Sequence, residues 1–317
     1  RGKMTSPPNV TVLLLTGYEE MGSMKYLYFV LIFVAFLVTI FLNGFLILVV
    51  YLKENLHKPM YIFLSNLFVN GLYLSVALYP QILSNLLSDV QMITRFWCQF
   101  QVFCLHNYVC CECTILTVMG YDRFVSICMP LQYHSIMTPG TVSKLVAFAW
   151  LFPVLILSGL LGLTSRVPLC GNTIGKVYCD NWSIVRLSCT DTTKENTYGI
   201  FASILFPGIP VLLVVLSYQR ILRACLKASK EARGKALTTC LPHIITFLKF
   251  CINVLFEVIS RRLDNSSVPL AVRTFLSLQL FIVPPLLNPL VYGLRLQEMR
   301  STVEKVFLRH KSAVQHN

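Results

Sequence analysis

Charged residues are scarce in this sequence. They make up 13% of its 317 residues, whereas hydrophobic residues make up 55%. A soluble domain has about 25% charged residues, so the deficit argues against an ordinary water-soluble protein. The mean hydropathy of +0.65 points the same way. We therefore predict that a lipid bilayer surrounds most of the chain.

Acidic residues are the scarcer of the two charged classes, with 14 Asp and Glu against 27 Lys and Arg. The resulting net charge of +13 raises the question of a nucleic-acid partner. The sequence has no dense run of Lys and Arg, however, and no basic stripe interleaved with aromatic residues. We therefore expect no binding to nucleic acid.

Motifs for catalysis and metal binding are also missing. The sequence has no HExxH, no glycine-rich phosphate loop and no recognisable Ser/His/Asp set, so we do not expect an enzyme. Cys110, Cys111 and Cys113 are close together in sequence. On one helix they point in different directions, so we expect no metal ion and no cofactor.

Long hydrophobic runs, by contrast, are abundant. A bilayer-spanning helix needs about 20 apolar residues, and seven stretches satisfy this condition. Five of them hold no charge, the third holds Glu112, and the sixth holds Lys249 and Glu257. The predicted fold is therefore all-α, an integral membrane bundle of seven transmembrane helices at residues 26–52, 59–88, 98–121, 145–163, 198–219, 236–260 and 274–294.

The distribution of Lys and Arg predicts the orientation, because these residues favour cytoplasmic loops. With the N-terminus outside, the cytoplasmic segments hold fifteen Lys and Arg against five acids, and the outer segments hold eleven against seven. Three N-x-S/T sequons, at Asn9, Asn181 and Asn265, all fall in outer segments, as glycosylation requires. We predict a plasma-membrane protein with an extracellular N-terminal tail (1–25), a seven-helix domain (26–294) and a cytoplasmic C-terminal region (295–317).

The C-terminal region has apolar residues at helical spacing beside cations. The apolar positions include Leu296, Met299 and Val303, and the cations include Arg300 and Lys305. This pattern predicts a short amphipathic helix that lies on the cytoplasmic membrane face in contact with lipids.

Four of the twelve cysteines fall in outer segments, which face an oxidising compartment. Cys98 begins the third span, and Cys170, Cys179 and Cys189 lie in the loop after the fourth. The even number predicts two disulfides, and four cysteines allow three connectivities.

Two groups of polar residues lie near the inner ends of the spans. Asp122 and Arg123 follow the third span, either as an ordinary helix-end ion pair or as an element that switches between partners. Asn288, Pro289 and Tyr292 end the seventh, where proline kinks a helix and asparagine can bond to freed carbonyls. Together with Tyr218 on the fifth span, they suit a bundle that rearranges.

Five short motifs lie at the ends of these spans. They are LHKPMY at residues 56–61, MGYDRFVSIC at 119–128, SY at 217–218, KALTTCLPH at 235–243 and PLLNPLVY at 285–292. Together they resemble the olfactory receptors, a family of rhodopsin-like G-protein-coupled receptors. The five motifs occur in the family's order on the corresponding spans, and the resemblance covers residues 43–307.

The resemblance implies roles for the polar residues at the inner ends. Arg123 would engage a heterotrimeric G protein on activation, with Tyr218 and Tyr292 as partners that move inward. The expected partner is a G protein of the stimulatory olfactory type, with cyclic AMP as the output.

The resemblance also implies the disulfide pairs Cys98–Cys179 and Cys170–Cys189. The sequence departs from the family at Gly71, where an aspartate is usual, and this departure puts a sodium site in doubt. Lys249 lies in a normally apolar stretch. We expect it either to pair with Glu112 or to reach water, because an unpaired buried charge is costly.

By the same resemblance, a small and largely hydrophobic odorant would bind among the outer halves of spans 3, 5, 6 and 7. His106 would supply one orienting hydrogen bond, or else be a core histidine satisfied by the protein. Arg262 would pair with a carboxylate on the ligand, or else lie at a solvated helix end. The other expected lining residues are mostly apolar, namely Val109, Cys110, Ala202, Cys251, Val254, Leu255, Val258 and Phe281.

Two other classes of protein remain as alternatives. A rhodopsin-like receptor for a peptide or a lipid would share the fold, but the second loop disulfide and the LHKPMY and KALTTC motifs favour an olfactory receptor. A secondary transporter would show inverted repeats and broken helices, and we find no internal repeat.

Overall fold

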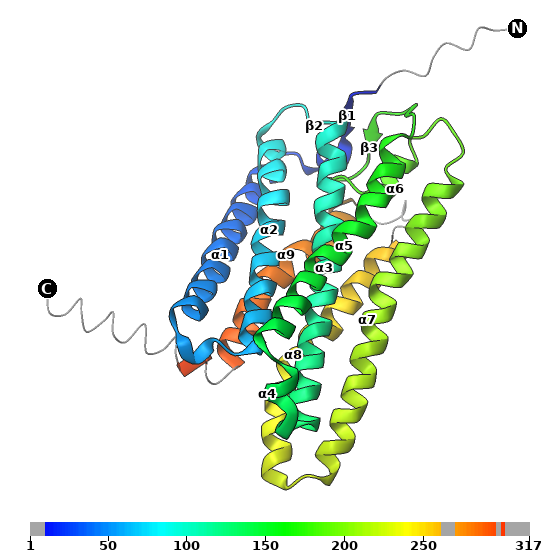
Figure 1. Ribbon diagram of the computed structural model, residues 1–317. Helices are drawn as coiled ribbons and strands as arrows, with labels where there is room; N and C mark the ends of the chain where they lie inside the picture. Colours follow the sequence, from blue (N-terminus) through cyan, green and yellow to red (C-terminus); the bar gives the residue numbers. More distant parts are fainter. Residues whose placement is uncertain (1–9, 261–269, 296–298, 302–317) are drawn as a thin grey trace, which may run out of the picture.

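Seven long helices form one bundle in the computed structural model, which describes residues 10–260, 270–295 and 299–301 (Figure 1). The predicted all-α seven-helix fold is confirmed. Six of the helices are apolar enough to cross a bilayer over their described residues, and the seventh contributes the apolar stretch Leu278–Gly293. The long helices are α1 (Met24–Leu52), α2 (Pro59–Leu87), α3 (Arg95–Cys128), α5 (Pro139–Ser165), α7 (Thr193–Lys227), α8 (Lys230–Ser260) and α9 (Leu270–Arg295).

The helix starts follow from local chemistry. The side chains of Thr94 and Thr138 accept hydrogen bonds from the backbone N–H groups of Trp97 and Thr141, and so cap α3 and α5. Pro59 occupies the first turn of α2, where its missing N–H costs nothing. Helices α3 and α5 therefore begin before the predicted stretches 98–121 and 145–163, whereas α2 begins at Pro59 as predicted.

Helices α7 and α8 are joined by only two residues, Ala228 and Ser229. The basic segment 220–235, which the sequence analysis assigned to a cytoplasmic loop, is therefore mostly helical, and the α7–α8 hairpin projects beyond the other helices (Figure 1). Long charged side chains such as those of Arg220 and Arg223 are compatible with a helix. The end of the apolar stretch therefore did not mean the end of the helix.

Short elements connect the long helices. They are the single-turn helices η1 (Thr16–Met21), η2 (Glu54–Leu56) and η3 (Pro130–Gln132), the helices α4 (Tyr133–Ile136) and α6 (Asn181–Val185), and the strands β1 (Val12–Leu15), β2 (Met92–Thr94) and β3 (Thr173–Ile174).

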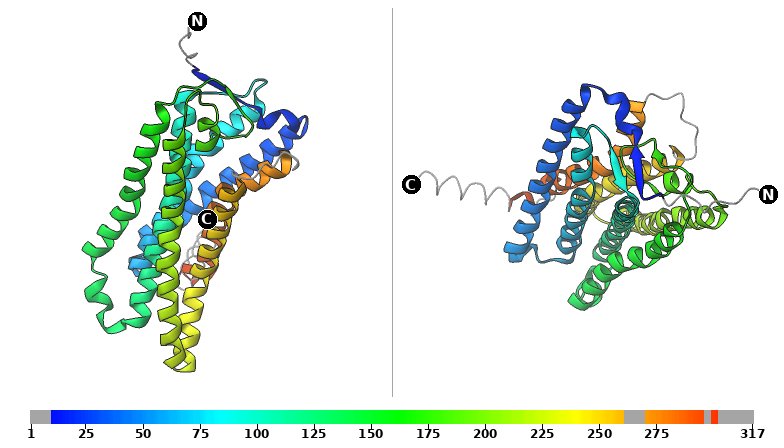
Figure 2. Two further views of the ribbon diagram at one scale, coloured as in Figure 1. Left: turned by 90° about the vertical axis from the view of Figure 1, so that its right-hand side faces the viewer. Right: turned by 90° about the horizontal axis from the view of Figure 1, so that it is seen from above.

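A small sheet closes the end of the bundle opposite the α7–α8 hairpin (Figures 1 and 2). Its strand order is β2-β1-β3, with β1 antiparallel to β2 and parallel to β3. The predicted N-terminal tail (1–25) thus contains a strand, which the sequence analysis did not foresee. A four-residue apolar run gives too short a pattern to identify a strand whose partners lie far away in the sequence.

The bundle is apolar outside and holds polar groups inside. Side chains such as Phe41, Leu155 and Leu212 are 58–72% exposed. Asn43, Asn70 and Glu112, in contrast, are at most 1% exposed. An apolar exterior over helices that satisfy their own backbone is what a bilayer requires, so the chain is a multi-pass membrane protein.

Candidate functional site

A polar network joins four helices in the interior of the bundle. The Glu112 carboxylate on α3 accepts hydrogen bonds from Nδ2 of Asn70 on α2 at 2.8 Å and from Nδ2 of Asn288 on α9 at 2.7 Å. On α1, Asn43 Nδ2 donates to the backbone oxygen of Pro285 at 2.9 Å. That oxygen is free because Pro289, four residues later, has no N–H to donate to it. We refer to Asn43, Asn70, Glu112 and Asn288 as the central network.

The structure shows what surrounds Glu112 and Gly71 in the central network. Within the described part of the chain, no ion pair of 4 Å or less joins Lys249 to Glu112; two amides hold that carboxylate instead. A Cβ atom at Gly71 would lie 3.2 Å from Asn43 Oδ1 and 3.3 Å from Pro285 Cβ. The missing side chain therefore lets α2 approach α1 and α9 closely.

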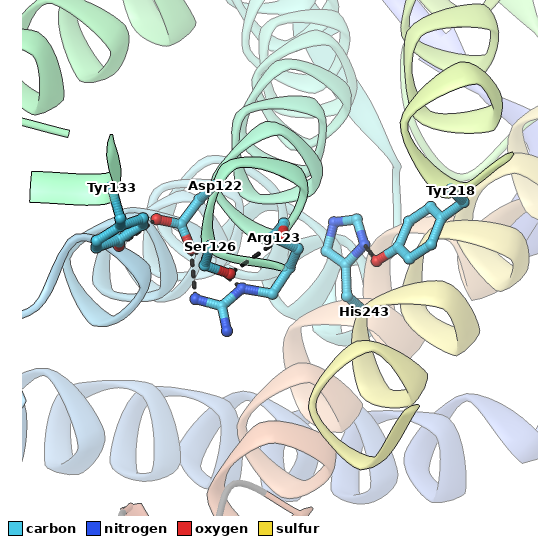
Figure 3. A network of polar contacts seen from close by, with 6 residues as sticks. All are labelled: Asp122, Arg123, Ser126, Tyr133, Tyr218 and His243. Atoms are coloured by element: carbon cyan, nitrogen blue, oxygen red, sulfur yellow. Dashed lines mark hydrogen bonds and ion pairs between the residues drawn. The ribbon is translucent and has the colours of Figure 1, made fainter. Parts of the chain in front are cut away.

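A second group of polar residues joins α3, α4, α7 and α8 (Figure 3). Arg123 forms an ion pair with the neighbouring Asp122. The other oxygen of Asp122 accepts a hydrogen bond from the Tyr133 hydroxyl at 2.7 Å. Burial and the nearby Asp122 carboxylate raise the pKa of Tyr133, so its hydroxyl keeps the proton that it donates. In this arrangement Arg123 is held on its own helix, and α4 holds its partner.

His243 connects three helices beside this ion pair. Its Nε2 lies 2.7 Å from the backbone oxygen of Leu116 on α3, and its Nδ1 lies 2.7 Å from the Tyr218 hydroxyl on α7. A carbonyl oxygen only accepts, so Nε2 carries the proton, and Nδ1 of the neutral ring accepts from Tyr218. His243 is 0% exposed, so both bonds are shielded from water.

Tyr292 lies near the C-terminal end of α9. It is 0% exposed, and its hydroxyl has no hydrogen-bond partner among the described residues. A buried hydroxyl without a partner is costly, which gives this side chain a reason to bond elsewhere in another arrangement of the bundle.

A cavity of about 130 Å³ lies among α3, α5, α7, α8 and α9, at the end of the bundle that carries the sheet and both disulfides. Residues 178–180 of the loop before α6, together with Asn181, Trp182 and Val185 of α6, also line it. Six residues expected from the sequence line this cavity: His106, Val109, Cys110, Ala202, Val254 and Phe281. Further apolar wall residues, which the sequence analysis did not name, are Leu105, Leu157, Leu160, Val185, Phe206 and Leu280.

Two of the remaining expected residues, Leu255 and Cys251, do not line the cavity. Leu255 is 60% exposed, because it is one residue beyond Val254 and a helix turns about 100° per residue. Cys251 packs against the main core instead of lining the cavity. The side chain of Val258 and all of Arg262 lie outside the described residues, so the expectations for them stay predictions.

The contacts of His106 are compatible with both expected roles, a bond to the ligand and a bond within the protein. Its Nδ1 is 2.8 Å from the backbone oxygen of Val102, one turn earlier on α3, so part of its hydrogen-bonding capacity is satisfied by its own helix. Its ring also lines the cavity.

The loop over the cavity supplies residues that the sequence analysis missed. The Tyr178 hydroxyl donates to Glu257 Oε1 on α8 at 3.1 Å, and its ring packs edge-on against Phe281 with centroids 5.4 Å apart. Lys176 lies 3.8 Å from the same Glu257 oxygen. Only Glu257 could have indicated these contacts from the sequence, because an acid within a membrane span needs a partner.

Two disulfides hold this loop. Cys98–Cys179 ties it to the start of α3, and Cys170–Cys189 closes the loop on itself. Both bonds join the cysteines that the resemblance pairs. Of the three sequon asparagines, Asn181 is half-buried and lines the cavity, while Asn9 and Asn265 lie outside the described residues.

Comparisons with known proteins agree on one family. Residues 31–310 match the family model described as olfactory receptor. The chain is 36% identical to human olfactory receptor 52D1 over 282 residues, which cover 88% of each chain. It is 35% identical to human olfactory receptor 52B6, covering 84% of this chain and 79% of that one. With mouse olfactory receptor 4B13 the identity is 33%, over 95% of this chain and 97% of the other.

Proposed function

Because the chain belongs to the olfactory receptor family, we propose that it detects a small odorant in the outer cavity and activates a G protein of the stimulatory olfactory type. At the level of the family it is an odorant-responsive G-protein-coupled receptor of the membrane, and it is not an enzyme. The identity of the G protein, the cyclic AMP output and the residues that bind the odorant belong to the proposal.

The outer cavity is the observation that carries this proposal. Its volume of about 130 Å³ is below the roughly 300–1,000 Å³ of pockets for drug-sized ligands, which favours a small volatile molecule over a peptide. Its walls are largely apolar, with polar side chains from His106, from the loop, and from α7 and α8. Those on α7 and α8 are Glu195, Asn196, Ser203 and Glu257. Such a site selects ligands by shape, with a few hydrogen bonds to orient them.

We place the sheet and the cavity outside the cell, and the α7–α8 hairpin in the cytoplasm. Both disulfides lie at the end that carries the sheet, and disulfides persist in oxidising compartments. Cations such as Arg220, Arg223 and Lys227 lie at the opposite end, as expected for a cytoplasmic surface. The C-terminal segment 302–317, outside the described residues, would then contact the inner leaflet.

Helix α8 supports a route from ligand to G protein. Val254 faces the cavity, and His243, about three turns along the same helix, bonds to α3 and α7. An odorant that binds better when α8 is displaced would weaken the His243 bonds and populate an open inner end. Arg123 would then leave Asp122 and meet the G protein.

A response panel tests the proposed function. The receptor is expressed at the cell surface with a stimulatory olfactory-type G protein, and cyclic AMP is recorded for aliphatic acids, amines, alcohols and aldehydes. We expect a dose-dependent response to at least one class. Surface expression with no response to any class would contradict the proposal.

Two neighbouring positions on α8 provide a matched test of the site. Val254→Phe adds a ring to the cavity wall, whereas Leu255→Phe adds the same kind of ring to a side chain that is 60% exposed on the outer face. We expect Val254→Phe to weaken the response at least about tenfold, the cost of overpacking by about 1–3 kcal/mol. Leu255→Phe should respond like the parent chain, and equal loss in both would refute the location of the site.

A further inference from the structure

The N-terminal segment lies directly against the loop that covers the cavity. Strand β1 pairs with β3 in the register Leu14↔Thr173 and Leu15↔Ile174, and the Leu14 N–H donates to the Asn172 oxygen at 2.7 Å. The loop then continues from β3 through residues 176 and 177 into the cavity-lining residues 178–182. Only three residues separate the end of the strand from Tyr178.

Gly17 makes the closest approach between the two segments. A Cβ atom at Gly17 would lie 2.4 Å from the carbonyl carbon of Lys176 and 2.6 Å from the nitrogen of Val177. These are backbone atoms, so a side chain at this position forces one of the two segments to move. The contact is therefore available only to glycine.

Tyr18 forms a hydrogen bond with the same part of the loop. Its hydroxyl donates to the backbone oxygen of Val177 at 2.7 Å, and its side chain is 6% exposed. Burial raises the pKa of Tyr18, so the hydroxyl keeps its proton and donates at physiological pH. Leu13 and Leu15 are at most 1% exposed and anchor the segment in the main core.

The other edge of β1 fixes the segment to the helices. Val12, Leu13 and Leu14 pair with β2, which directly precedes α3. The Arg95 N–H, in the first residue of α3, donates to the Thr11 oxygen at 2.8 Å. The segment thus links the start of α3, the helix that carries His106 and Cys110, to the loop that lines the cavity.

We propose that the N-terminal segment 11–18 is part of the ligand-recognition apparatus, with Gly17 and Tyr18 as positioning residues that set the height of loop residues 177–182 over the cavity. Neither residue lines the cavity; both act through the backbone of Lys176 and Val177. As far as it concerns ligands, this inference rests on the proposed function of the cavity.

The first test needs no odorant. Cys110 is a free thiol that lines the cavity, so its reaction with the membrane-impermeant reagent methanethiosulfonate ethyltrimethylammonium reports how far the loop is closed. The same reaction in a Cys110→Ala background subtracts the other seven free cysteines. Rates are compared at equal surface level, measured with an antibody against an N-terminal tag.

The chain offers a matched control for Gly17→Ala. Gly175 belongs to the same loop, but a Cβ atom there would meet nothing within 4 Å. We expect Gly17→Ala to speed the labelling of Cys110 by about tenfold, which corresponds to about 1.4 kcal/mol in the opening equilibrium. Gly175→Ala should match the parent chain. Equal rates in both variants would overturn the proposal.

Tyr18→Phe carries the test if Gly17→Ala does not reach the surface. This change removes the hydroxyl that donates to Val177 and also interacts with Asn85. Tyr26→Phe, at a side chain that is 59% exposed, is its control. We expect faster labelling in Tyr18→Phe alone. Labelling that is unchanged in Tyr18→Phe would contradict the positioning role.

The second test measures selectivity. Straight-chain alcohols and aldehydes of increasing length are compared by the concentration that gives a half-maximal cyclic AMP response. We expect Gly17→Ala and Tyr18→Phe to change the ratio of potencies between short and long ligands at constant surface level, since a purely structural role would lower the surface level without changing the ratio. Faster labelling without any odorant response would support the positioning role and refute the proposed function.

Discussion

At the scale of single residues, the buried side chains of Glu112 and His243 are held by partners from other helices. Glu112 has Asn70 and Asn288, and His243 has Tyr218 and the Leu116 oxygen. Polar groups in a bilayer persist where they are paired or serve a function. These contacts therefore define one arrangement of the bundle, and removing them should shift the receptor towards another.

Loss of the His243 contacts should raise basal signalling. His243→Phe keeps the ring but removes both hydrogen bonds, which together are worth about 1–2 kcal/mol between helices. That energy corresponds to a roughly 5–30-fold change in the ratio of the two states. Basal cyclic AMP without ligand is the measurement. Tyr121→Phe, which alters a partly exposed tyrosine on α3, should leave it unchanged, and no difference between the two would contradict the prediction.

Loss of one donor to Glu112 should destabilise the receptor. Asn288→Leu leaves the buried carboxylate with only Asn70, at a cost of about 1–3 kcal/mol. We expect the thermal midpoint of the purified receptor to fall by several degrees. Ser217→Ala removes a hydroxyl that is exposed and bonds within its own helix, so it should have little effect. An equal midpoint in Asn288→Leu and the parent chain would refute the role of the central network.

At the scale of secondary-structure elements, α7 and α8 act as a hairpin. Two residues connect them, and both helices continue past the inner ends of their neighbours (Figure 1). The cations of segment 220–235 are thereby presented on rigid helices instead of on a flexible loop. We infer that the hairpin forms one wall of the G-protein surface and that its helicity matters for coupling.

A proline near the end of α7 tests this inference. Leu226 is 68% exposed in the last turn, so Leu226→Pro breaks helical hydrogen bonds without touching the core. Proline inside a helix costs about 3 kcal/mol, enough to unwind a terminal turn. We expect the cyclic AMP response to fall while the surface level and the Cys110 labelling rate stay constant. Leu226→Ala is the control, and a full response in Leu226→Pro would disprove the requirement.

At the scale of the whole molecule, the two ends of the bundle are built differently. The outer end is closed by a sheet, a covering loop and two disulfides, whereas the inner end is held by single hydrogen bonds and one ion pair. Covalent and multi-strand links resist motion more than isolated polar contacts do. A rearrangement should therefore open the inner end while the outer end stays closed over its ligand.

The two disulfides should contribute unequally to stability. Cys98–Cys179 closes a segment of 81 residues and Cys170–Cys189 one of 19 residues. Chain entropy predicts contributions of about 4–5 and about 3 kcal/mol. We expect the thermal midpoint to decrease from the parent chain to Cys170→Ser/Cys189→Ser and further to Cys98→Ser/Cys179→Ser. The reverse order would show that the loop-internal bond is the more important one.

The sequence by itself determined the fold and the position of the switch residues along it. A helix that crosses a bilayer must be apolar for about 20 residues and satisfy its own backbone, so hydropathy alone located all seven helices. The five motifs then located Asp122, Arg123, Tyr218 and Tyr292 on the expected helices. Only Tyr292 lies near a helix end, because α3 continues to Cys128 and α7 to Lys227. Six of the residues that line the cavity followed as well, because positions such as Val109, Cys110 and Val254 face inward on the expected helices.

Only the tertiary structure decided which groups meet. Asn288 and Glu112 are 176 residues apart, and their contact depends on how two helices are rotated about their axes. Spacing in the sequence does not contain that rotation, so Lys249 was an equally reasonable partner for Glu112, and Leu255 as reasonable a lining residue as Val254. The same holds for the outer sheet. A strand of four residues is held by pairing with both β2 and β3, and Gly17 and Tyr18 contact a loop that begins more than 150 residues later.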